Sequence, residues 1–487
     1  MKKNLKILAA LGATVAARCA VGPNYKAPVA AVPAGWSRAG VGAEPAHLAD
    51  WWVILQDATL TSLEDRAAQA NLDLKLAAAR VREARAARGM AAADQLPEVG
   101  ANGGYSRERL SPNSPIGPLI PNPNFGDWTA GFDANWELDF FGRVRRSVEA
   151  ADAEMAATEE SERGVLVTVQ AEVARDHVEL RSAQQRLGIA EGTLASERDT
   201  LGLAKERNRV GLEADFDVTR AEAETSATEA ELPLLRQEIT ESVYALGVLL
   251  GREPNALAEE LNPVAPIPAT PERIAAGLPS DLLRRRPDIR QAERKLAAEN
   301  ARIGVAEADY FPRFDLKAGL GIEATRVAML GDINSRDYSL GPSFGWAIFD
   351  AGKIRNHVRA QDARRDEAEV RYEQTVLIAL REVETALARY ETEAERRKGL
   401  QAAEASDRRT LELARERYRQ GATDLLGVLD AQRLLFAAQD ALAQSYQATA
   451  TDWVALYKSL GGGWEGSAGA PLARLNPNSN AKPKKVL

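Results

Sequence analysis

Two spacings of apolar residues divide the chain into helical and strand-forming stretches. From about residue 143 to 210 no proline occurs, and large apolar residues recur every seven positions, as in coiled coils: Val173, Leu180, Leu187, Leu194 and Leu201. At about 1.5 Å per residue such a helix is roughly 100 Å long, far longer than a globular core needs. The returning stretches, about 215–250 and 425–460, carry two adjacent apolar seams. An isolated two-helix coiled coil needs one seam, so we expect a wall of helices curved into a tube.

The second spacing is an alternation of apolar and polar residues, which predicts strands with one apolar and one polar face. It covers residues 128–139, 313–324 and 338–349. A fourth strand, within residues 100–110, has few apolar residues and is expected only because the repeat described below requires it. Together these stretches predict two β-hairpins, at about 98–140 and 313–350.

Amphipathic strands of about ten residues fit either a soluble sandwich or a membrane barrel that turns its apolar face to lipid. Here four strands give only one small sheet, and no second sheet is evident. Because an open sheet edge in lipid leaves backbone groups unpaired, other copies must complete the barrel. Two copies give a barrel filled by side chains, whereas three can leave a water-filled lumen. The predicted fold class is mainly α, a long α-helical coiled-coil barrel with four β-strands per chain. The strands require an oligomer of preferably at least three chains, and a trimer would form a 12-stranded membrane β-barrel.

The chain contains two copies of one unit. A shift of 210 residues places Trp136 on Trp346 and Gly211 on Gly421, in a register that holds without a gap. Upstream, residues 71–99 match 286–314 at a shift of 215, and the extra residues fall in the loop 111–124, where length changes are tolerated. Both glycines lie where a very long helix must reverse, since glycine takes the left-handed conformation after a helix end at little cost.

These patterns predict the boundaries of the chain's segments. Residues 1–18 are a signal peptide and 19–58 an extended N-terminal segment. Repeat 1 (59–250) and repeat 2 (279–463) each contain a helix, at about 59–95 or 279–309, then a β-hairpin and a long helical hairpin with its tip near 211 or 421. A proline-rich linker, 251–278, joins the repeats, and 464–487 form a C-terminal tail.

The N-terminus has the features of an export signal. Lysines precede a short apolar run that ends at Ala17, well below the roughly 20 residues that cross a bilayer. Cys19, the only cysteine, stands where bacterial lipoproteins are acylated, although Ala16 and Arg18 differ from the usual pattern. Cleavage after Ala17 with an unmodified thiol is the alternative. A single cysteine excludes an intrachain disulfide.

Composition and motifs exclude several classes of function. A net charge of -8 argues against nucleic-acid binding. The three histidines, His47, His177 and His357, have no metal-ligand spacing, and the chain has neither a phosphate-binding glycine loop nor a nucleophile elbow. We therefore expect no enzyme activity, no catalytic residue, no cofactor and no metal site.

Distinctive motifs are spread over nearly the whole chain. They are "CAVGPNYKAP" after the signal, "WW" at 51–52, "NLDLKLAAARVREARA", "ADYFPRFDL", the paired "RVGLEADFDV" and "RQGATDLLGVLDAQRLL", and the closing "LYKSLGGGW". Together they resemble the bacterial outer-membrane efflux factors of the TolC type, most closely the NodT/OprM-like lipoprotein branch. The resemblance implies a homotrimer embedded in outer-membrane lipid, with a helical tunnel that crosses the periplasm. It also implies two partners, a periplasmic adaptor protein and an inner-membrane RND-type pump, which together expel drugs or other small molecules.

The resemblance also implies roles for individual residues. It assigns lipidation to Cys19, and adaptor contacts to the tip residues Val210, Gly211, Leu212 and Gly421. A periplasmic gate is implied by an acidic ring, an apolar constriction and a hydrogen-bonded linking pair, which fall respectively on Asp430, Leu426, and Asp217 with Tyr418. Some members carry a linking arginine and a second aspartate where this chain has Thr423 and Gly427. A weaker or differently built latch is therefore expected.

Two other functions remain open at this point. One is an exit duct for type I protein secretion, built on the same channel. The other is an exported coiled-coil scaffold lipoprotein without a pore. Conductance in planar bilayers separates the scaffold from either channel. The neighbouring genes, for an adaptor and a proton-driven pump or for an ATP-driven exporter beside its toxin, separate the two channels.

Overall fold

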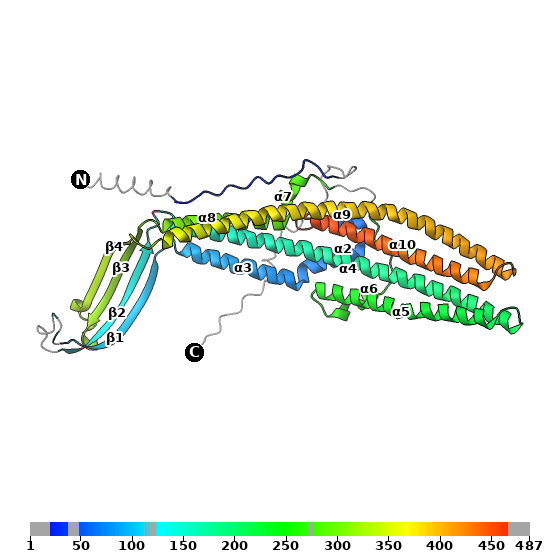
Figure 1. The fold of residues 1–487 in the computed structure, drawn as a ribbon. Coiled ribbons are helices and arrows are strands. Elements are labelled where there is room, and N and C mark those ends of the chain that lie inside the picture. The colour runs from blue at the N-terminus through cyan, green and yellow to red at the C-terminus, as the bar shows by residue number, and fades with distance from the viewer. Residues whose placement is uncertain are drawn as a thin grey trace. The chain divides into compact units, whose positions relative to one another are not determined.

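The computed structural model describes residues 20–37, 48–111, 113, 115, 123–271 and 276–465 (Figure 1). The chain divides into two compact units. Unit 1 draws on residues 1–29, 81–159 and 291–373, and unit 2 on 30–80, 160–290 and 374–487. Four helices contribute residues to both units: α3 (Leu72–Ala93), α4 (Arg143–Arg209), α8 (Pro287–Ala308) and α9 (Lys353–Arg419).

Unit 1 contains one four-stranded antiparallel sheet in the order β1-β2-β3-β4. Its strands are β1 (Glu98–Arg109), β2 (Asn124–Glu137), β3 (Arg313–Ala324) and β4 (Arg336–Gly345). The register aligns Ala101, Phe132, Leu320 and Tyr338 in one row across the sheet, and Gly100, Asp133, Gly319 and Ser339 in the next. Since directly paired residues share a face, the alternation in the sequence gives one apolar and one polar face.

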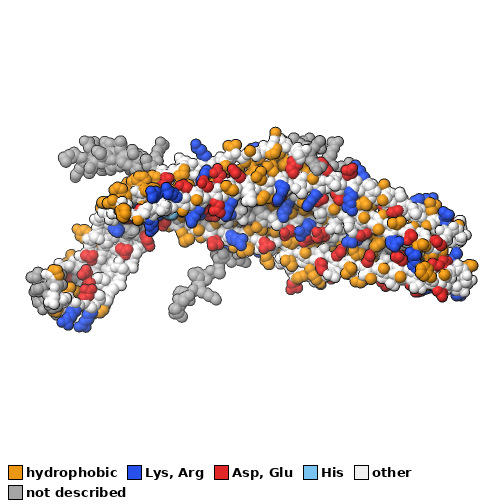
Figure 2. All heavy atoms as spheres, viewed as in Figure 1, with side chains coloured by type: hydrophobic (Ala, Val, Ile, Leu, Met, Phe, Trp, Pro, Cys, Tyr) orange, Lys and Arg blue, Asp and Glu red, His pale blue; other side chains and the backbone are white. Residues whose placement is uncertain are grey.

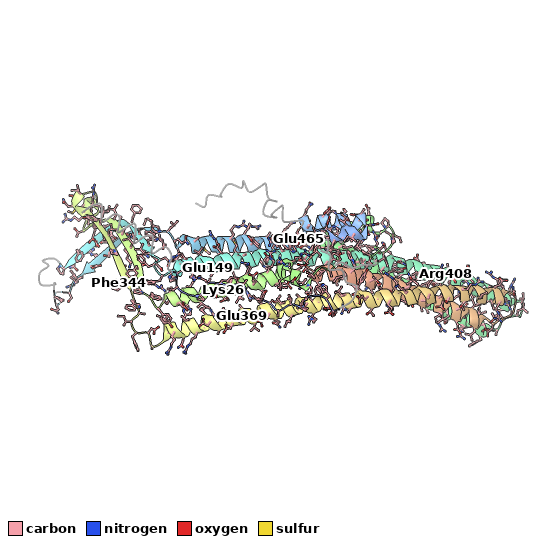
Figure 3. All side chains as sticks on the ribbon, turned by 90° about the horizontal axis from the view of Figure 1, so that it is seen from above. Lys26, Glu149, Phe344, Glu369, Arg408 and Glu465 are labelled. Atoms are coloured by element: carbon pink, nitrogen blue, oxygen red, sulfur yellow. The ribbon has the colours of Figure 1, made fainter. Side chains whose placement is uncertain are left out.

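The apolar face of this sheet is open in the single chain. Tyr338 is 85% exposed, and Phe132, Leu320, Leu340 and Phe344 are exposed as well (Figure 3 labels Phe344). Apolar side chains gathered in this way on one face require a covering medium or partner.

The second hairpin ends earlier than its alternation suggested. β4 stops at Gly345, so Trp346 and Ile348 lie beyond the sheet rather than inside a strand that reaches 349. The Trp346 indole donates to the Tyr310 carbonyl oxygen at 3.0 Å, and this contact holds the side chain at the end of the preceding helix. Trp136 makes the same bond with the Gln95 carbonyl oxygen.

Unit 2 is helical, and its helices pack side by side through apolar residues. α4 is followed by α5 (Asp215–Leu249), and α9 by α10 (Leu425–Ser459). One core cluster joins α4, α5 and α10 through Ala190, Leu194, Leu232, Leu235 and the partly buried Leu187 and Phe436. A second core contains the aromatic rings of Trp51, Trp453 and Tyr457, whose centroids lie 4.2 to 5.8 Å apart. Trp51 belongs to the short 3₁₀ helix η1 (Trp51–Leu55).

Each helix expected at the start of a repeat is interrupted once. The first consists of α2 (Ala58–Ala70) and α3, separated by Asn71, whose side-chain oxygen accepts from the amides of Asp73 and Leu74. The second consists of η4 (Pro279–Asp281), α7 (Leu282–Arg285) and α8, and it breaks at Arg286 before Pro287. Asn71 and Arg286 both hold the end of a distant helix, by donating to the carbonyl oxygens of Leu249 and Ser459 respectively.

The proline-rich linker contains two short helices, η3 (Pro254–Leu257) and α6 (Ala258–Leu261). Leu257 and Leu261 are fully buried, so this part of the linker contributes to the core of unit 2. Two remaining 3₁₀ turns, η5 (Val327–Met329) and η6 (Ile333–Ser335), connect β3 to β4.

The helix surfaces carry mixed charge. Figure 2 shows acidic and basic side chains interspersed over the visible face. Among the residues that the structure describes, none of the helices is both long enough and apolar enough to cross a membrane.

Candidate functional site

The candidate site lies in unit 2, where α4 turns into α5 and α9 turns into α10. Gly211 and Gly421 have φ angles of 77° and 72°, the left-handed conformation that favours glycine. Each turn is closed by the same pair of bonds: Gly211 and Leu212 donate to Asn208 and Arg207, as Gly421 and Ala422 donate to Tyr418 and Arg417. These are the bonds of a Schellman-type helix end, so glycine is required by the backbone conformation.

The returning helices begin in two different ways. In the first turn the Asn208 amide donates to the Glu213 carbonyl oxygen and to the Asp215 carboxylate, at 2.9 Å each. In the second turn Asp424 caps α10 by accepting from the Gly427 amide at 3.1 Å. The first turn is thus held by side-chain bonds between residues before and after Gly211, whereas the second is held by an N-cap.

Three side chains join the two turns of the chain. Tyr418, at the end of α9, donates its hydroxyl proton to Glu213 Oε2 at 2.9 Å. Arg207, at the end of α4, donates to the same oxygen at 3.1 Å, and its guanidinium lies 4.8 Å from the Tyr418 ring centroid. The Glu213 side chain is only 8% exposed. The contacts combine an ion pair, a hydrogen bond and a cation–π interaction between the two hairpins.

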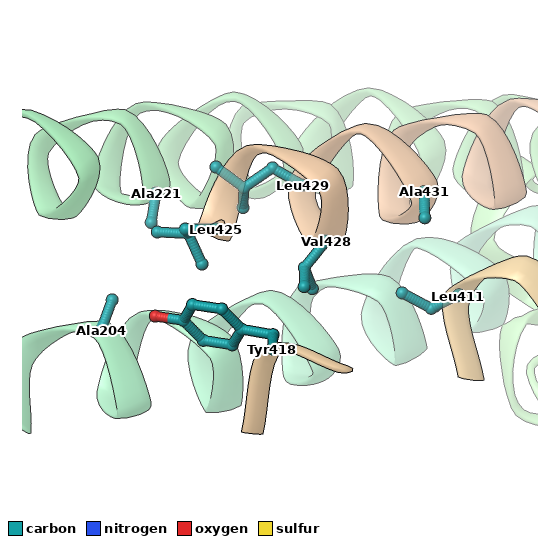
Figure 4. Packing of buried hydrophobic residues seen from close by; sticks show 8 residues of the cluster. All are labelled: Ala204, Ala221, Leu411, Tyr418, Leu425, Val428, Leu429 and Ala431. Atoms are coloured by element: carbon teal, nitrogen blue, oxygen red, sulfur yellow. The ribbon is translucent and has the colours of Figure 1, made fainter. Parts of the chain in front are cut away.

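Tyr418 is also part of an apolar cluster. Its side chain is 2% exposed and packs with Ala204, Ala221, Leu425 and Val428, with its ring among these residues (Figure 4). Burial, followed by the hydrogen bond to Glu213, raises the pKa of the Tyr418 hydroxyl. The hydroxyl therefore stays protonated and remains a donor to Glu213.

The gate residues implied by the resemblance are only partly brought together. Asp217 makes no hydrogen bond to Tyr418, whose hydroxyl binds Glu213, so the implied linking pair is not formed in the single chain. Asp430 forms an ion pair with Arg433 of the same helix at 2.7 Å. Leu426 is half-buried and adjoins the fully buried Leu425.

The implied adaptor-contacting residues are accessible. Val210 is 62% exposed and Leu212 68% exposed, and both glycines are exposed. Phe216, which sequence reasoning did not single out, is 71% exposed four residues after Leu212. The first tip thus presents three large apolar side chains to solvent.

Sequence reasoning also missed Arg207 and Glu213. A lone acid and a lone arginine near a helix end are usually solvated, so only their opposite charges beside Gly211 could have suggested a pair. Their partner, Tyr418, is 211 residues after Arg207 in the sequence.

Replacing Glu213 with alanine should loosen this region. Arg207 and the Tyr418 hydroxyl would lose their shared acceptor, which costs about 1–3 kcal/mol of local stability. Hydrogen exchange at the amides of Gly211 and Gly421 measures the change. Glu206→Ala is the control, because Glu206 forms an exposed ion pair with Arg209 only. Equal exchange rates in both variants would contradict this assignment.

The remaining residues named from the sequence lie elsewhere. Cys19 and His47 fall outside the described residues. His177 is buried against Asp57 at 2.8 Å, and His357 contacts Gln361 at 3.1 Å. Within the described part of the chain, no group of three His, Cys, Asp or Glu side chains is arranged to hold a metal ion.

Comparisons with known proteins cover most of the chain. The model of the outer membrane efflux protein family matches residues 63–252 and 278–462. Outer membrane protein OprJ of Pseudomonas aeruginosa is 32% identical over 92% of this chain and 93% of its own length. Toluene efflux pump outer membrane protein TtgF of Pseudomonas putida is 32% identical over 94% of this chain and 97% of its own.

A solved structure of the outer-membrane channel OprN has a TM-score of 0.85 with this fold, at 37% identity, and the match covers 92% of this chain and all of that one. The mainly helical fold with one small antiparallel sheet is therefore the fold of such channels. The family resemblance inferred from the motifs is confirmed. By sequence and by fold, this chain belongs to the outer membrane efflux protein family.

Proposed function

We propose that this chain is the outer-membrane channel of a tripartite efflux system, which carries drugs or other small molecules from the periplasm or an inner-membrane pump to the exterior. The observation that carries the proposal is the exposed apolar face of the sheet in a member of this family. Lipid is the cover that such a face takes in an outer-membrane barrel. The name of the relative TtgF, an efflux pump component, favours efflux over protein secretion.

Two partners follow from this role, a periplasmic adaptor and an inner-membrane RND-type pump. We assign the adaptor contact to Val210, Gly211, Leu212 and Gly421. The exposed apolar side chains of Val210, Leu212 and Phe216 support this assignment. They do not pack into the chain's own core, and exposed apolar groups gathered in one place favour a protein partner.

The chain consists of two copies of one repeat, each of which carries two of the four strands. Equal lengths support this organisation, since α4 and α9 both have 67 residues and α5 and α10 both have 35. The paired bonds of Trp136 and Trp346, and the paired helix breaks at Asn71 and Arg286, occur at equivalent positions. The two segments matched by the family model also correspond to the two copies.

The repeat suggests how three chains assemble. In unit 2, α4 of the first copy contacts α8 and α10 of the second, through Glu160 with Arg290 and Asp440 with Arg186. In the repeat, α9 is the equivalent of α4, and α3 and α5 are the equivalents of α8 and α10. If the same contact forms between chains, α9 of one chain contacts α3 and α5 of the next. This heterologous contact closes into a ring of three, with twelve strands in one barrel.

Exposure in the single chain supports this arrangement. Leu377 on α9 is 64% exposed, whereas its equivalent on α4, Val167, is 6% exposed. On the other side of the interface, Leu72 and Tyr244 are exposed, whereas their equivalents Pro287 and Val454 are buried. Each copy thus leaves open the face that its equivalent buries.

The resting channel is closed at the tips. We assign the acidic ring to Asp430 and the neighbouring constriction to Leu426. We assign the link between helices to Tyr418 and Asp217, with Glu213 as the acceptor of Tyr418 within one chain. Three Asp430 carboxylates near one axis repel each other and favour a bound cation.

Cys19 is the proposed site of lipid attachment in the mature protein. The next residue, Ala20, packs against Gly142, where a Cβ would lie 2.7 Å from the Ala20 Cα atom. Gly142 lies between the end of β2 and the start of α4, so the residue that follows Cys19 is held at the end of the sheet.

The efflux function predicts a broad change in sensitivity. A strain that lacks this chain should be inhibited by lower concentrations of several antibiotics, dyes, detergents or metals than its parent, and the intact gene should restore resistance. Minimal inhibitory concentrations over such a panel measure the effect. A deletion strain with unaltered sensitivity that no longer secretes a protein would instead favour the secretion duct.

A further inference from the structure

The first residues that the structure describes, 20–25, are bound to the helices of unit 1 by several hydrogen bonds. Val21 donates its amide to the Phe141 carbonyl oxygen at 3.0 Å. The Asn300 side chain donates to the Pro23 carbonyl oxygen at 2.9 Å, and the Tyr25 hydroxyl donates to Glu293 Oε1 at 3.1 Å. Residues 20–25, called the strap below, thus bind α4 and α8 of unit 1 (Figure 3 labels Lys26, the residue after the strap, and Glu149 on α4).

One buried arginine makes most of the strap's contacts. Arg146 on α4 has a side chain that is 4% exposed. Its guanidinium donates to the carbonyl oxygens of Val21 and Gly22 and to the Asn24 side chain, at 3.0 Å each. Its third nitrogen, Nη1, donates to Glu149 Oε2 at 2.7 Å. A buried arginine whose donors are directed at the backbone of one extended segment is a binding site for that segment.

Two glycines allow the close approach. Gly22 has a φ of 90°, and a Cβ on it would lie 2.4 Å from the Gly304 Cα atom. A Cβ on Gly304 would lie 2.9 Å from the Arg146 side chain. The strap therefore fits only when position 22 and position 304 both lack a side chain.

The equivalent position in the other copy has no such site. At the repeat offsets, Asn356 takes the place of Arg146 and Gly89 that of Gly304. Asparagine has no guanidinium, so the second copy lacks the side chain that makes most of the strap's contacts. The strap site is therefore a property of the first copy and not of the repeated helical packing.

We infer that Arg146, Gly304 and Asn300 form a receptor for the first residues of the mature chain. Binding of these residues to the receptor places the lipid anchor at the membrane end of the channel. The inference rests on the proposed acylation of Cys19. Docking of the strap holds Ala20 at the β2–α4 junction, where β2 ends and α4 begins. An acyl group one residue earlier then enters the same membrane as the sheet, so anchor and sheet bind together as two linked contacts rather than independently.

The first test asks whether the strap is docked by these residues. Gly22→Val acts on the strap alone, and Arg146→Gln acts on the receptor. Because the proposed ring buries the exposed face of α9, the matched control is Arg326→Gln, in the exposed loop between β3 and β4. In the purified full-length protein, hydrogen exchange at the Val21 amide should rise at least about tenfold in both docking variants and stay unchanged in Arg326→Gln. A Val21 amide that remains protected in Gly22→Val would overturn the receptor.

The second test asks whether docking acts through the anchor. The amount of channel protein in the outer-membrane fraction should fall severalfold in Gly22→Val, although mass spectrometry of the N-terminal peptide still detects the acyl group. Cys19→Ser should cause a similar loss, and the double variant should lose no more than either single variant. Independent losses that multiply in the double variant would refute the coupling. An unacylated wild-type peptide would instead refute the lipid anchor proposed above, and the exchange experiment would still decide on the receptor.

Discussion

Replacement of Asp430 with alanine is expected to raise the single-channel conductance several-fold in planar bilayers. In the proposed trimer, three Asp430 side chains lie near one axis, where they narrow the entrance and favour a bound cation. Alanine removes the carboxylates and shortens the side chains, so both the bound cation and the constriction are lost. Within one chain the change removes only the half-exposed ion pair with Arg433, a contact worth about 0–1 kcal/mol.

The control for this experiment is Asp199→Ala. Asp199 is an exposed acid on α4, and its replacement changes the net charge by the same amount. Equal conductance of the wild type, Asp430→Ala and Asp199→Ala would remove Asp430 from the gate. A conductance that rises in both variants would point to overall charge rather than to a ring at the tip.

A second substitution separates the link from the ring. If Tyr418 is part of the latch, Tyr418→Phe should raise the conductance further in the Asp430→Ala background. Phenylalanine keeps the ring within its apolar cluster and removes only the hydroxyl that binds Glu213. The comparison therefore tests one hydrogen bond with little change in packing.

The sequence contains most of what determines the individual elements. Proline-free, helix-forming sequence before Gly211 and before Gly421 is a local property, and α4 and α9 reverse at these glycines. The alternation of residues 128–139 likewise sets the two faces of β2, because side chains on a strand point to opposite faces in turn.

The break before Pro287 was a local signal that the sequence reasoning passed over. Other features that were not predicted depend on residues far apart in the sequence. The helix break at Asn71 includes its bond to the Leu249 carbonyl oxygen, which is 178 residues away. No local pattern indicates that this acceptor lies nearby. Tyr418 had two acids near the opposite tip, Glu213 and Asp217, as candidate acceptors. Only the positions of the two hairpins in space selected Glu213.

The largest expected effect on assembly comes from Leu377→Arg. In the proposed ring, the exposed face of α9 is buried against α3 and α5 of the next chain. An arginine there would place an unpaired charge in an apolar contact, which costs several kcal/mol at each of the three interfaces. We therefore expect this variant to be monomeric in detergent and the wild type to be the proposed trimer, as measured by size-exclusion chromatography with light scattering.

A matched substitution distinguishes the interface from the general effect of a new charge. Val264 in the linker is 76% exposed and lies outside the face that the repeat assigns to the next chain, so Val264→Arg should leave the trimer intact. A trimer that survives Leu377→Arg as well as Val264→Arg would disprove the arrangement derived from the repeat. Loss of the trimer would also leave the barrel open, since four strands with an exposed apolar face cannot close without neighbours. Loss of the α9 contact should therefore abolish conductance together with the trimer.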